Sequence, residues 1–275
     1  MELTIAFWNR WWRGNRDRQV DYLTTTSVEW DVLLLAELTG IAYRDFAHRL
    51  GASSSAYARD LVDVTDMRYP NAVGVIARHG IELHRPRLVF DGRTPGEGQP
   101  RPERCLAVDV AGADPSLTLV AWHAPYAGSA SDTLRKHRAY RHMTTWLGSQ
   151  RAPIVLGMDG NNWWEPGTQE EPDPSDIFHA EHQFHQRPTS HGLVDTLISA
   201  AEAGHAETEP ADGCAAPTHL LKNQAHRMDR IYASPDARVL AGGVDYAGRR
   251  LAEVNSRRDL CAGSDHALVW ATLEM

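Results

Sequence analysis

Cysteine is scarce in this chain of 275 residues. The three cysteines, Cys105, Cys214 and Cys261, lie far apart and form no CxxC pair. A sparse and odd-numbered set is more consistent with reduced thiols in a cytosolic compartment than with a disulfide framework. We therefore expect a cytoplasmic protein without structural disulfides.

Long hydrophobic runs are also missing. No apolar run approaches the roughly 20 residues that a membrane-spanning helix requires. The first residues, MELTIAFWNRWWRGN, carry charge on both sides of a short apolar run and contain no small-residue cleavage site. This segment predicts a first strand and not a signal peptide, so we expect no membrane association.

The chain has no excess of positive charge. Its formal net charge is −8, which argues against a protein that coats nucleic acid through bulk electrostatics, although a local basic groove stays compatible. The apolar fraction of 42% and the charged fraction of 23% are ordinary for a soluble globular protein. The chain is long enough to bury a sizeable core, and we expect a monomer.

Short apolar segments predict β-strands at 3–8, 31–37, 72–77, 105–110, 117–123, 153–159, 227–233 and 266–273. Apolar residues at helical spacing predict helices over 16–30, 132–150 and 192–204. Gly- and Pro-rich or acidic segments at 91–103 and 165–176 predict loops, and neither is a convincing domain linker. We find no internal repeat. Mixed strands and helices over the whole length favour one layered α/β or α+β domain, 1–275.

Acids, amides and histidines lie at the ends of these strands, where rigid scaffolds carry catalytic groups. The set is Asn9, Glu37, His123, Asp159, Asn161, Asp229, Asp265 and His266. When each residue is considered by itself, most have an ordinary structural explanation, such as a turn or a helix cap. Asp229 is harder to explain, because it lies inside an apolar strand and a buried charge requires a partner. That partner could be a cation or a histidine, or it could be Arg227 or Arg230.

The chemistry of this set favours a hard divalent cation. It contains the carboxylates of Glu37, Asp159 and Asp265 together with amides and imidazoles, but no thiolate. Such oxygen ligands select Mg²⁺, Mn²⁺ or Ca²⁺ over Zn²⁺. Mg²⁺ usually binds one or two carboxylates and keeps sites for water and phosphate oxygens. The sequence therefore predicts a site for a hard cation such as Mg²⁺ or Mn²⁺, with other carboxylates and amides free to orient an attacking water.

Seven short motifs occur in an informative order: WN at 8–9, LAE at 35–37, WH at 122–123, GMDGNN at 157–162, GLVD at 192–195, RMDRIY at 227–232 and GSDH at 263–266. This series resembles that of the endonuclease/exonuclease/phosphatase superfamily, which includes pancreatic deoxyribonuclease, apurinic endonucleases, deadenylases and inositol polyphosphate phosphatases. The resemblance implies a four-layer α/β sandwich, with two mixed β-sheets packed face to face and flanked by helices. It also implies in-line attack of water on a phosphate ester, with Asp159 or the His266–Asp229 pair taking the proton of that water.

The resemblance assigns roles to the residues at the strand ends. Glu37 resembles the principal metal ligand, and Asn9 and Asp265 resemble residues close to the ion or its waters. Asp159 and Asn161 resemble the pair that positions and deprotonates the water and contacts the phosphate.

The histidines also match positions of the superfamily pattern. His266 resembles the histidine that touches the scissile phosphate, and Asp229 resembles the acid that fixes its tautomer. His123 matches a position that contacts phosphate in several members. Departures such as Ala36, where many members have Gln, and Arg230, where many nucleases have Tyr, leave the substrate open.

Two tryptophan-containing segments bear on the substrate. RWWRGNRDR at 10–18 places Arg10, Trp11 and Arg13 directly after Asn9, where they could stack bases and contact phosphates or could simply cap the core. Trp163 and Trp164 could stack a base from the other side or pack their loop. Histidines at 179, 182 and 185 share helical spacing, but a solvated segment is a better interpretation than a zinc site, because no cysteine accompanies them.

We expect a Mg²⁺-dependent phosphodiesterase that acts on nucleic acid, with DNA favoured over RNA. The nearest alternative is a phosphomonoesterase acting on a nucleotide, sugar or inositol phosphate. A catalytically inactive binding module is a third interpretation, which the presence of the full set of candidate ligands disfavours.

Overall fold

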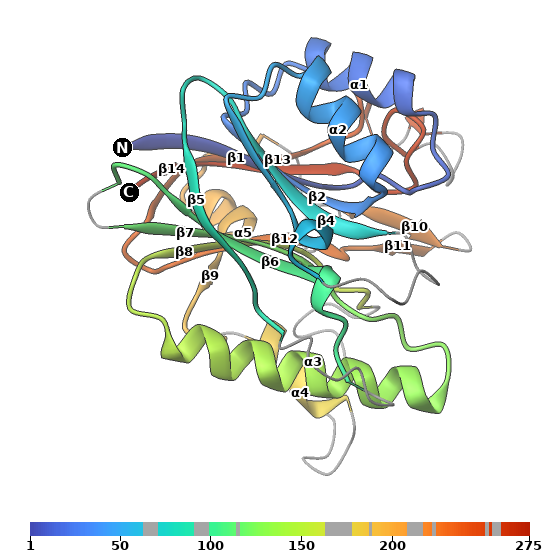
Figure 1. Cartoon of the computed structure of the whole chain (residues 1–275), viewed down its shortest axis with the longest axis vertical. Coiled ribbons are helices and arrows are strands. Elements are labelled where there is room, and N and C mark those ends of the chain that lie inside the picture. Colours follow the sequence, from blue (N-terminus) through green and yellow to red (C-terminus); the bar gives the residue numbers. More distant parts are fainter. Residues whose placement is uncertain are drawn as a thin grey trace.

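The computed structural model describes residues 1–62, 71–90, 99–113, 116–162, 178–186, 189–207, 217–221, 224–250, 253–254 and 260–275. Two six-stranded mixed sheets pack face to face, and helices cover their outer faces (Figure 1). The four-layer α/β sandwich expected from the sequence is confirmed. In the described part of the chain, no helix has the length and apolar character needed to cross a membrane.

The first sheet contains both ends of the chain, which lie near each other in Figure 1. Its strands β1 and β2 run parallel, and all its other neighbours are antiparallel. Helices α1 (Arg16–Thr25) and α2 (Gly40–Arg49) lie on its outer side. The strand order is β13 (Arg238–Asp245), β14 (Leu268–Glu274), β1 (Glu2–Asn9), β2 (Val32–Leu38), β4 (Ala72–Ala77) and β3 (Ser54–Tyr57).

The second sheet is built around another parallel pair, β7 and β8. Helices α3 (Ala130–Ser149) and α4 (His179–His185) cover its outer face, and α5 (Thr196–Glu202) contacts β12 and β13. A separate hairpin, β10 (His219–Leu221) and β11 (Gln224–His226), lies beside the two sheets. The strand order is β5 (Leu83–Leu88), β6 (Cys105–Val110), β7 (Leu117–His123), β8 (Ile154–Asp159), β12 (Asp229–Ala233) and β9 (Val194–Asp195).

The apolar strand runs of the sequence become the interface between the sheets. Every residue of β7 and of β8 is buried, as expected for strands that are covered on both faces. Gly157 packs directly against the first sheet, because a Cβ atom there would come within 2.6 Å of Leu34 Cδ1 and 2.9 Å of Phe7 Cδ2. Close packing of this kind fixes how the strand ends of one sheet meet those of the other.

The eight expected strands are all present, and the expected helices differ mainly at their ends. The helix predicted over 132–150 begins two residues earlier, because Ser129 caps it by accepting a hydrogen bond from the Asp132 N–H. The prediction of a helix over 192–204 is wrong for the first residues of this segment. Its residues Val194–Asp195 pair with β12 as strand β9, and only then does α5 begin. The loop predicted at 165–176 lies outside the described residues.

Candidate active site at the strand ends of both sheets

The two sheets deliver polar side chains to one shared edge. Strand register pairs Asn9 with Ala36 in the first sheet and His123 with Asp159 in the second. The Asn9 Nδ2 donates a hydrogen bond of 2.8 Å to Asp159 Oδ2, and this bond joins residues 150 positions apart in the chain. Both side chains are buried. The carboxyl ends of the two parallel strand pairs therefore form one site.

Glu37 is presented to this site by an irregularity in β2. The pairing of β2 with β4 shifts register between Leu35 and Leu38, and Glu37 adopts a positive φ of 58°. Such bulges re-aim side chains, and strained backbone of this type is frequent at functional sites. The Trp12 N–H donates to Glu37 Oε2 at 3.0 Å, while Oε1 lies 3.9 Å from His123 Nε2. One carboxylate oxygen is thus fixed by the backbone and the other faces the site.

A tight turn follows β8 and holds Asp159. The Asn161 N–H donates to Asp159 Oδ1 at 2.8 Å, and Asn161 itself has a positive φ of 49°. Its side-chain Nδ2 donates to the Ala124 carbonyl at 2.8 Å. A Cβ atom at Gly160 would lie 2.7 Å from Asn162 Oδ1, so a larger residue there would require the Asn162 side chain to move. Both carboxylate oxygens of Asp159 are thus held, Oδ1 by the Asn161 N–H of the turn and Oδ2 by Asn9 at the end of β1.

Two side chains of helix α3 hold this turn in place through hydrogen bonds. The Lys136 Nζ donates to the Asn161 carbonyl at 2.8 Å and to Glu181 Oε1 at 2.7 Å, and the Tyr140 hydroxyl donates to the Gly160 carbonyl at 2.7 Å. Burial lowers the pKa of the Lys136 amine, although the charge of Glu181 opposes the shift. Sequence reasoning missed this support. Its only signal was a lysine and a tyrosine on the apolar face of the predicted helix.

His266 and Asp229 form a buried pair. The His266 Nδ1 lies 2.7 Å from Asp229 Oδ2, and the Asp229 backbone N–H donates to Thr218 Oγ1 at 2.8 Å. Burial opposes charge on the imidazole, but the carboxylates of Asp229 and Asp159 outweigh it and raise the pKa of His266 to about 10. The imidazole is therefore charged at neutral pH.

The two arginines that could have paired with Asp229 form ion pairs with a different carboxylate. Arg227 and Arg230 both bind Asp195, at 2.6 Å and 3.3 Å. These two arginines stabilise the start of α5, where Asp195 also accepts from the Ile198 N–H. The partner that Asp229 requires is therefore the histidine.

His123 is neutral and contacts an arginine that sequence reasoning missed. Burial, followed by the positive charges of Arg104 and His266, lowers the pKa of His123 well below its usual value. The Arg104 guanidinium contacts His123 Nδ1, and His123 Nε2 lies 3.5 Å from Asp159 Oδ2. Arg104 ends the 3₁₀ helix Pro102–Arg104 just before β6. No motif in the sequence marked it.

The charge at this edge of the sheets is predominantly negative. Burial raises the pKa of Asp159, and the nearby Asp229 adds to the shift while His266 opposes it. Within the described residues, Asp229 Oδ1 and Asp265 Oδ1 are buried without a hydrogen-bond partner. Unsatisfied carboxylate oxygens of this kind are costly unless a cation binds them. The donor set therefore fits an oxygen-ligated divalent ion.

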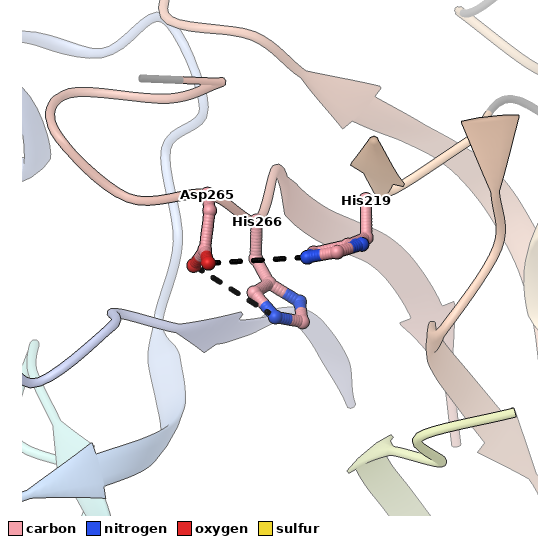
Figure 2. A group of neighbouring side chains, drawn as sticks. All are labelled: His219, Asp265 and His266. Atoms are coloured by element: carbon pink, nitrogen blue, oxygen red, sulfur yellow. Dashed lines mark ion pairs between the residues drawn. The ribbon is translucent and has the colours of Figure 1, made fainter. Parts of the chain in front are cut away.

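Asp265 lies between two imidazoles (Figure 2). Its Oδ1 is 3.9 Å from His266 Nε2, and its Oδ2 is 3.9 Å from the Nε2 of His219, which begins β10. Burial by itself would raise the pKa of Asp265, but the imidazoles of His219 and His266 lower it overall. His219 was not among the residues that the sequence singled out.

No protein-family model and no curated protein matches this sequence. Solved structures do match. TDP2 of D. rerio, complexed with a single-strand DNA product, has 15% identity and a TM-score of 0.65, and the match covers 100% of this chain and 99% of that one. An endonuclease/exonuclease/phosphatase structure from Beutenbergia cavernae has 20% identity and a TM-score of 0.64, with 100% and 72% covered. An AP endonuclease from Archaeoglobus fulgidus has 14% identity and a TM-score of 0.65, with 99% and 100% covered.

This chain has the endonuclease/exonuclease/phosphatase fold. The likeness lies in the backbone arrangement, since identities of 14–20% say little about individual side chains. The order of motifs that first indicated this fold therefore agrees with the arrangement of both sheets.

The substrate-binding residues expected after Asn9 divide into two groups. Arg10 is only 2% exposed, and its Nε donates to Gln19 Oε1 at 2.8 Å while its other nitrogens approach backbone carbonyls, that of Glu37 included. Burial lowers its pKa to about 10. This guanidinium supports the backbone beneath Glu37 and is not directed toward solvent, so we do not retain it as a substrate-binding group.

The tryptophans and the second arginine are more accessible. Trp11 is half-buried with a positive φ of 51°, and its N–H donates to Asn9 Oδ1 at 3.1 Å. Trp12 is 45% exposed, and the exposed Arg13 places its guanidinium 4.8 Å from the centre of the Trp12 ring. Trp163 and Trp164 lie outside the described residues.

The histidines of the 179–185 segment lie on a helix, α4, and His182 and His185 are buried, so the expectation of a solvated segment is wrong. His185 contacts the Tyr140 hydroxyl at 3.1 Å through Nε2 and the Tyr232 hydroxyl at 2.8 Å through Nδ1, so both of its ring nitrogens are occupied. Groups of described residues with metal-ligand spacing are found around His266 and do not include α4. The role of His185 is to hold Tyr140 under the Gly160 turn.

Proposed function

We propose that this protein hydrolyses phosphodiester bonds of nucleic acid with the help of a divalent cation, and that DNA is preferred over RNA. One observation carries the proposal: the Asn9–Asp159 hydrogen bond and the His266–Asp229 pair bring both ends of the chain to one edge, where Glu37 faces His123. The shared fold with TDP2, solved with a DNA product, and with an AP endonuclease supports a nucleic-acid substrate.

Glu37 would hold Mg²⁺ or Mn²⁺ through the carboxylate oxygen that faces the site, with Asn9 and Asp265 as further candidates for the ion or its waters. The fit rests on the unpartnered oxygens at this edge and on the absence of a thiolate from the donor set. When bound, the cation would neutralise charge that develops on the phosphoryl group and on the leaving oxygen. The hydrogen bond from Trp12 N–H keeps the Glu37 carboxylate in place.

Asp159 would accept the proton of the attacking water. Its raised pKa makes it a better base than an ordinary carboxylate, and Asn9 and the Asn161 N–H hold its two oxygens in fixed directions. Asn161 orients this turn and brings its carboxamide to the same edge. His266, charged and held by Asp229, would donate a hydrogen bond from Nε2 to a phosphoryl oxygen.

Neutral His123 and the adjacent Arg104 would complete the phosphate contact. The guanidinium supplies positive charge beside His123, and this contact directs His123 Nε2 toward Asp159 and Glu37. The exposed Trp12–Arg13 pair and the neighbouring Trp11 offer aromatic and cationic surface for a base next to the scissile phosphate. Trp163 and Trp164 would offer aromatic surface for the same base.

We further propose that the protein acts as a cytoplasmic monomer. Cys105 and Cys261 are buried free thiols, and burial raises the pKa of both. Thiols in this state are unreactive and are suited to a reducing compartment.

A panel of substrates tests the proposal. Plasmid, single-stranded DNA, RNA and a small phosphomonoester are incubated with purified protein and Mg²⁺ or Mn²⁺, with and without EDTA. We expect metal-dependent cleavage of DNA that falls at least about 100-fold in Asp159→Ala, a typical loss for a general base. Asp236→Ala, at an exposed turn, is the matched control and should leave the rate unchanged.

The other outcomes point elsewhere. Phosphate release from the monoester without cleavage of any nucleic acid would replace the proposal with a phosphomonoesterase. Equal activity in Asp159→Ala would contradict the assigned base, and no turnover of any phosphate ester would favour a binding module.

A further inference from the structure

The bulge in β2 is the feature that turns Glu37 toward the site. Leu35 pairs with Gly74 of β4. The next pair in the ladder joins Leu38 to Ala72, so β2 has one residue more than β4 over this stretch. Glu37 has a positive φ of 58°, a conformation that residues other than glycine adopt only at a cost in free energy. Such a conformation persists only where the surrounding structure holds it.

Three consecutive backbone carbonyls at this bulge, those of residues 36–38, accept hydrogen bonds from outside β2 and β4. The Arg10 N–H donates to the Ala36 carbonyl at 3.5 Å, and the Arg10 guanidinium donates to the Glu37 carbonyl at the same distance. The Tyr57 hydroxyl donates to the Leu38 carbonyl at 2.9 Å, and this bond is buried. Since the usual range is about 2.7–3.2 Å, the contact from Tyr57 is the best formed of the three.

The Tyr57 side chain is itself held in place. It ends β3, is only 4% exposed, and stacks on Tyr43 of α2 with the ring centroids 4.7 Å apart and the rings inclined by 13°. Burial raises the pKa of Tyr57 to about 12, so the hydroxyl keeps its proton at neutral pH and can donate a hydrogen bond. A fixed ring with a single proton to donate is suited to holding one carbonyl.

Gly74 allows Tyr57 to reach the bulge. It pairs with Leu35 on one side and with Tyr57 on the other, so β4 lies between β2 and β3. A Cβ atom at Gly74 would lie 2.9 Å from Leu38 Cδ1 and 3.3 Å from Tyr43 Cδ2. The glycine therefore leaves the space that these two side chains occupy, and the Tyr57 hydroxyl reaches the Leu38 carbonyl across one intervening strand.

We propose that Tyr57 is a positioning residue for Glu37: its hydroxyl holds the Leu38 carbonyl and so keeps the bulge in the conformation in which one Glu37 oxygen faces the site. This proposal rests on the proposed role of Glu37 as a metal ligand. Groups that orient a metal ligand without touching the ion commonly change the metal affinity about 10- to 100-fold when they are removed. Loss of the Tyr57 hydroxyl should therefore weaken Mg²⁺ binding more than it changes kcat of the metal-saturated protein.

Mg²⁺ binding to substrate-free protein, measured by isothermal titration, tests this proposal. Tyr57→Phe removes only the hydroxyl and should weaken Mg²⁺ binding by about 10-fold. Tyr43→Phe is the matched control, because it removes a hydroxyl from the same ring stack. That hydroxyl donates to Ser55 Oγ at 2.8 Å, on the edge strand β3, and the variant should bind Mg²⁺ as wild type. Incorporation of 4-aminophenylalanine at position 57 restores a donor and should recover most of the lost affinity.

The metal dependence of DNA cleavage gives an independent measurement. Tyr57→Phe should require about 10-fold more Mg²⁺ for half-maximal activity and should approach the wild-type kcat at saturating Mg²⁺. A purely structural role would reduce the active fraction at every Mg²⁺ concentration and would leave the half-maximal concentration unchanged. That result would overturn the proposal.

Glu37→Ala separates this proposal from the proposed function. If Glu37→Ala weakens Mg²⁺ binding but folded Tyr57→Phe binds as wild type, the positioning role is wrong and the proposed function stands. If Glu37→Ala itself binds Mg²⁺ as wild type, the ligand role on which both depend is wrong. An equal loss in Tyr43→Phe would indicate general loosening of the ring stack and would also overturn the proposal. If Tyr57→Phe does not fold, 4-fluorophenylalanine at position 57 fills the space of the hydroxyl without donating, and the same loss is expected.

Discussion

The buried pair of Lys136 and Glu181 gives the most quantitative prediction. Their side chains are 3% and 4% exposed, and the Nζ–Oε1 distance is 2.7 Å. Lys136→Met keeps the length and apolar stem of the side chain but leaves the Glu181 carboxylate buried without its cation. Removal of one partner of a buried ion pair costs about 3–5 kcal/mol. We therefore expect the free energy of unfolding of Lys136→Met to fall by about that amount at pH 7.

The loss should depend on pH in a defined direction. Burial already raises the pKa of Glu181 even though Lys136 opposes the shift. Without Lys136 the pKa rises further, so the folded variant binds a proton more readily than the unfolded chain does. The penalty should then be smallest at low pH, where the carboxyl is protonated in both states, and should grow as pH rises. Urea unfolding followed by circular dichroism at pH 5 and pH 7 measures this difference.

A second substitution and a control complete the test. Lys136→Met/Glu181→Gln removes the unpaired charge and should recover a large part of the lost stability. Arg141→Met changes a cation on an exposed position of the same helix and should alter stability by no more than roughly 0.5 kcal/mol. A loss below about 1 kcal/mol in Lys136→Met would refute the reasoning. So would a double variant that is no more stable than the single one.

The same substitution should also affect the site. Lys136 holds the Asn161 carbonyl, and the Asn161 N–H holds Asp159. We expect a lower kcat in Lys136→Met at a temperature where it is fully folded, since small misplacements of a catalytic group are costly. An unchanged kcat would mean that the turn keeps its position without the lysine.

Three further results are expected. Glu37→Ala should lower Mg²⁺ affinity, measured by isothermal titration, and the rate together; a rate loss with normal Mg²⁺ affinity would contradict its role as ligand. His266→Ala should reduce kcat by about 10²–10⁴-fold with the fold and most of the Mg²⁺ affinity intact, and a wild-type rate would exclude the phosphate contact. The Nδ1 of His191 accepts from the Leu193 N–H, and burial lowers the pKa of His191 to about 4. A lowered pKa means that the unfolded chain binds the extra proton first, so stability should fall as pH drops from about 6.5 to 4, by about 3 kcal/mol in total. Urea unfolding over that range should show a weaker dependence in His191→Asn, and equal slopes in both proteins would refute the assignment.

The sequence by itself determined eight of the strands, three of the helices and their order, whereas strands β3, β5, β9, β10, β11 and β13 and helices α2 and α4 were not predicted. Short apolar runs predicted these strands correctly because the apolar character of a segment can be read from its own residues. The order of the motifs at the strand ends indicated the fold. Local patterns could not decide whether residues 194–195 form a strand, because that depends on their pairing with β12.

Only the tertiary structure decided which side chains meet. Asn9 and Asp159 are 150 positions apart, and Trp8 donates to the His266 carbonyl across 258 positions. The choice of His266 as the partner of Asp229, and the burial of Arg10, follow from how the two sheets pack. The packing of the two sheets also explains why three residues without a sequence signal lie at the site, namely Arg104, Lys136 and His219. Composition and spacing along the chain carry no information on such contacts. The contacts form, and stabilise the protein, only when strands that are distant in the sequence pack together.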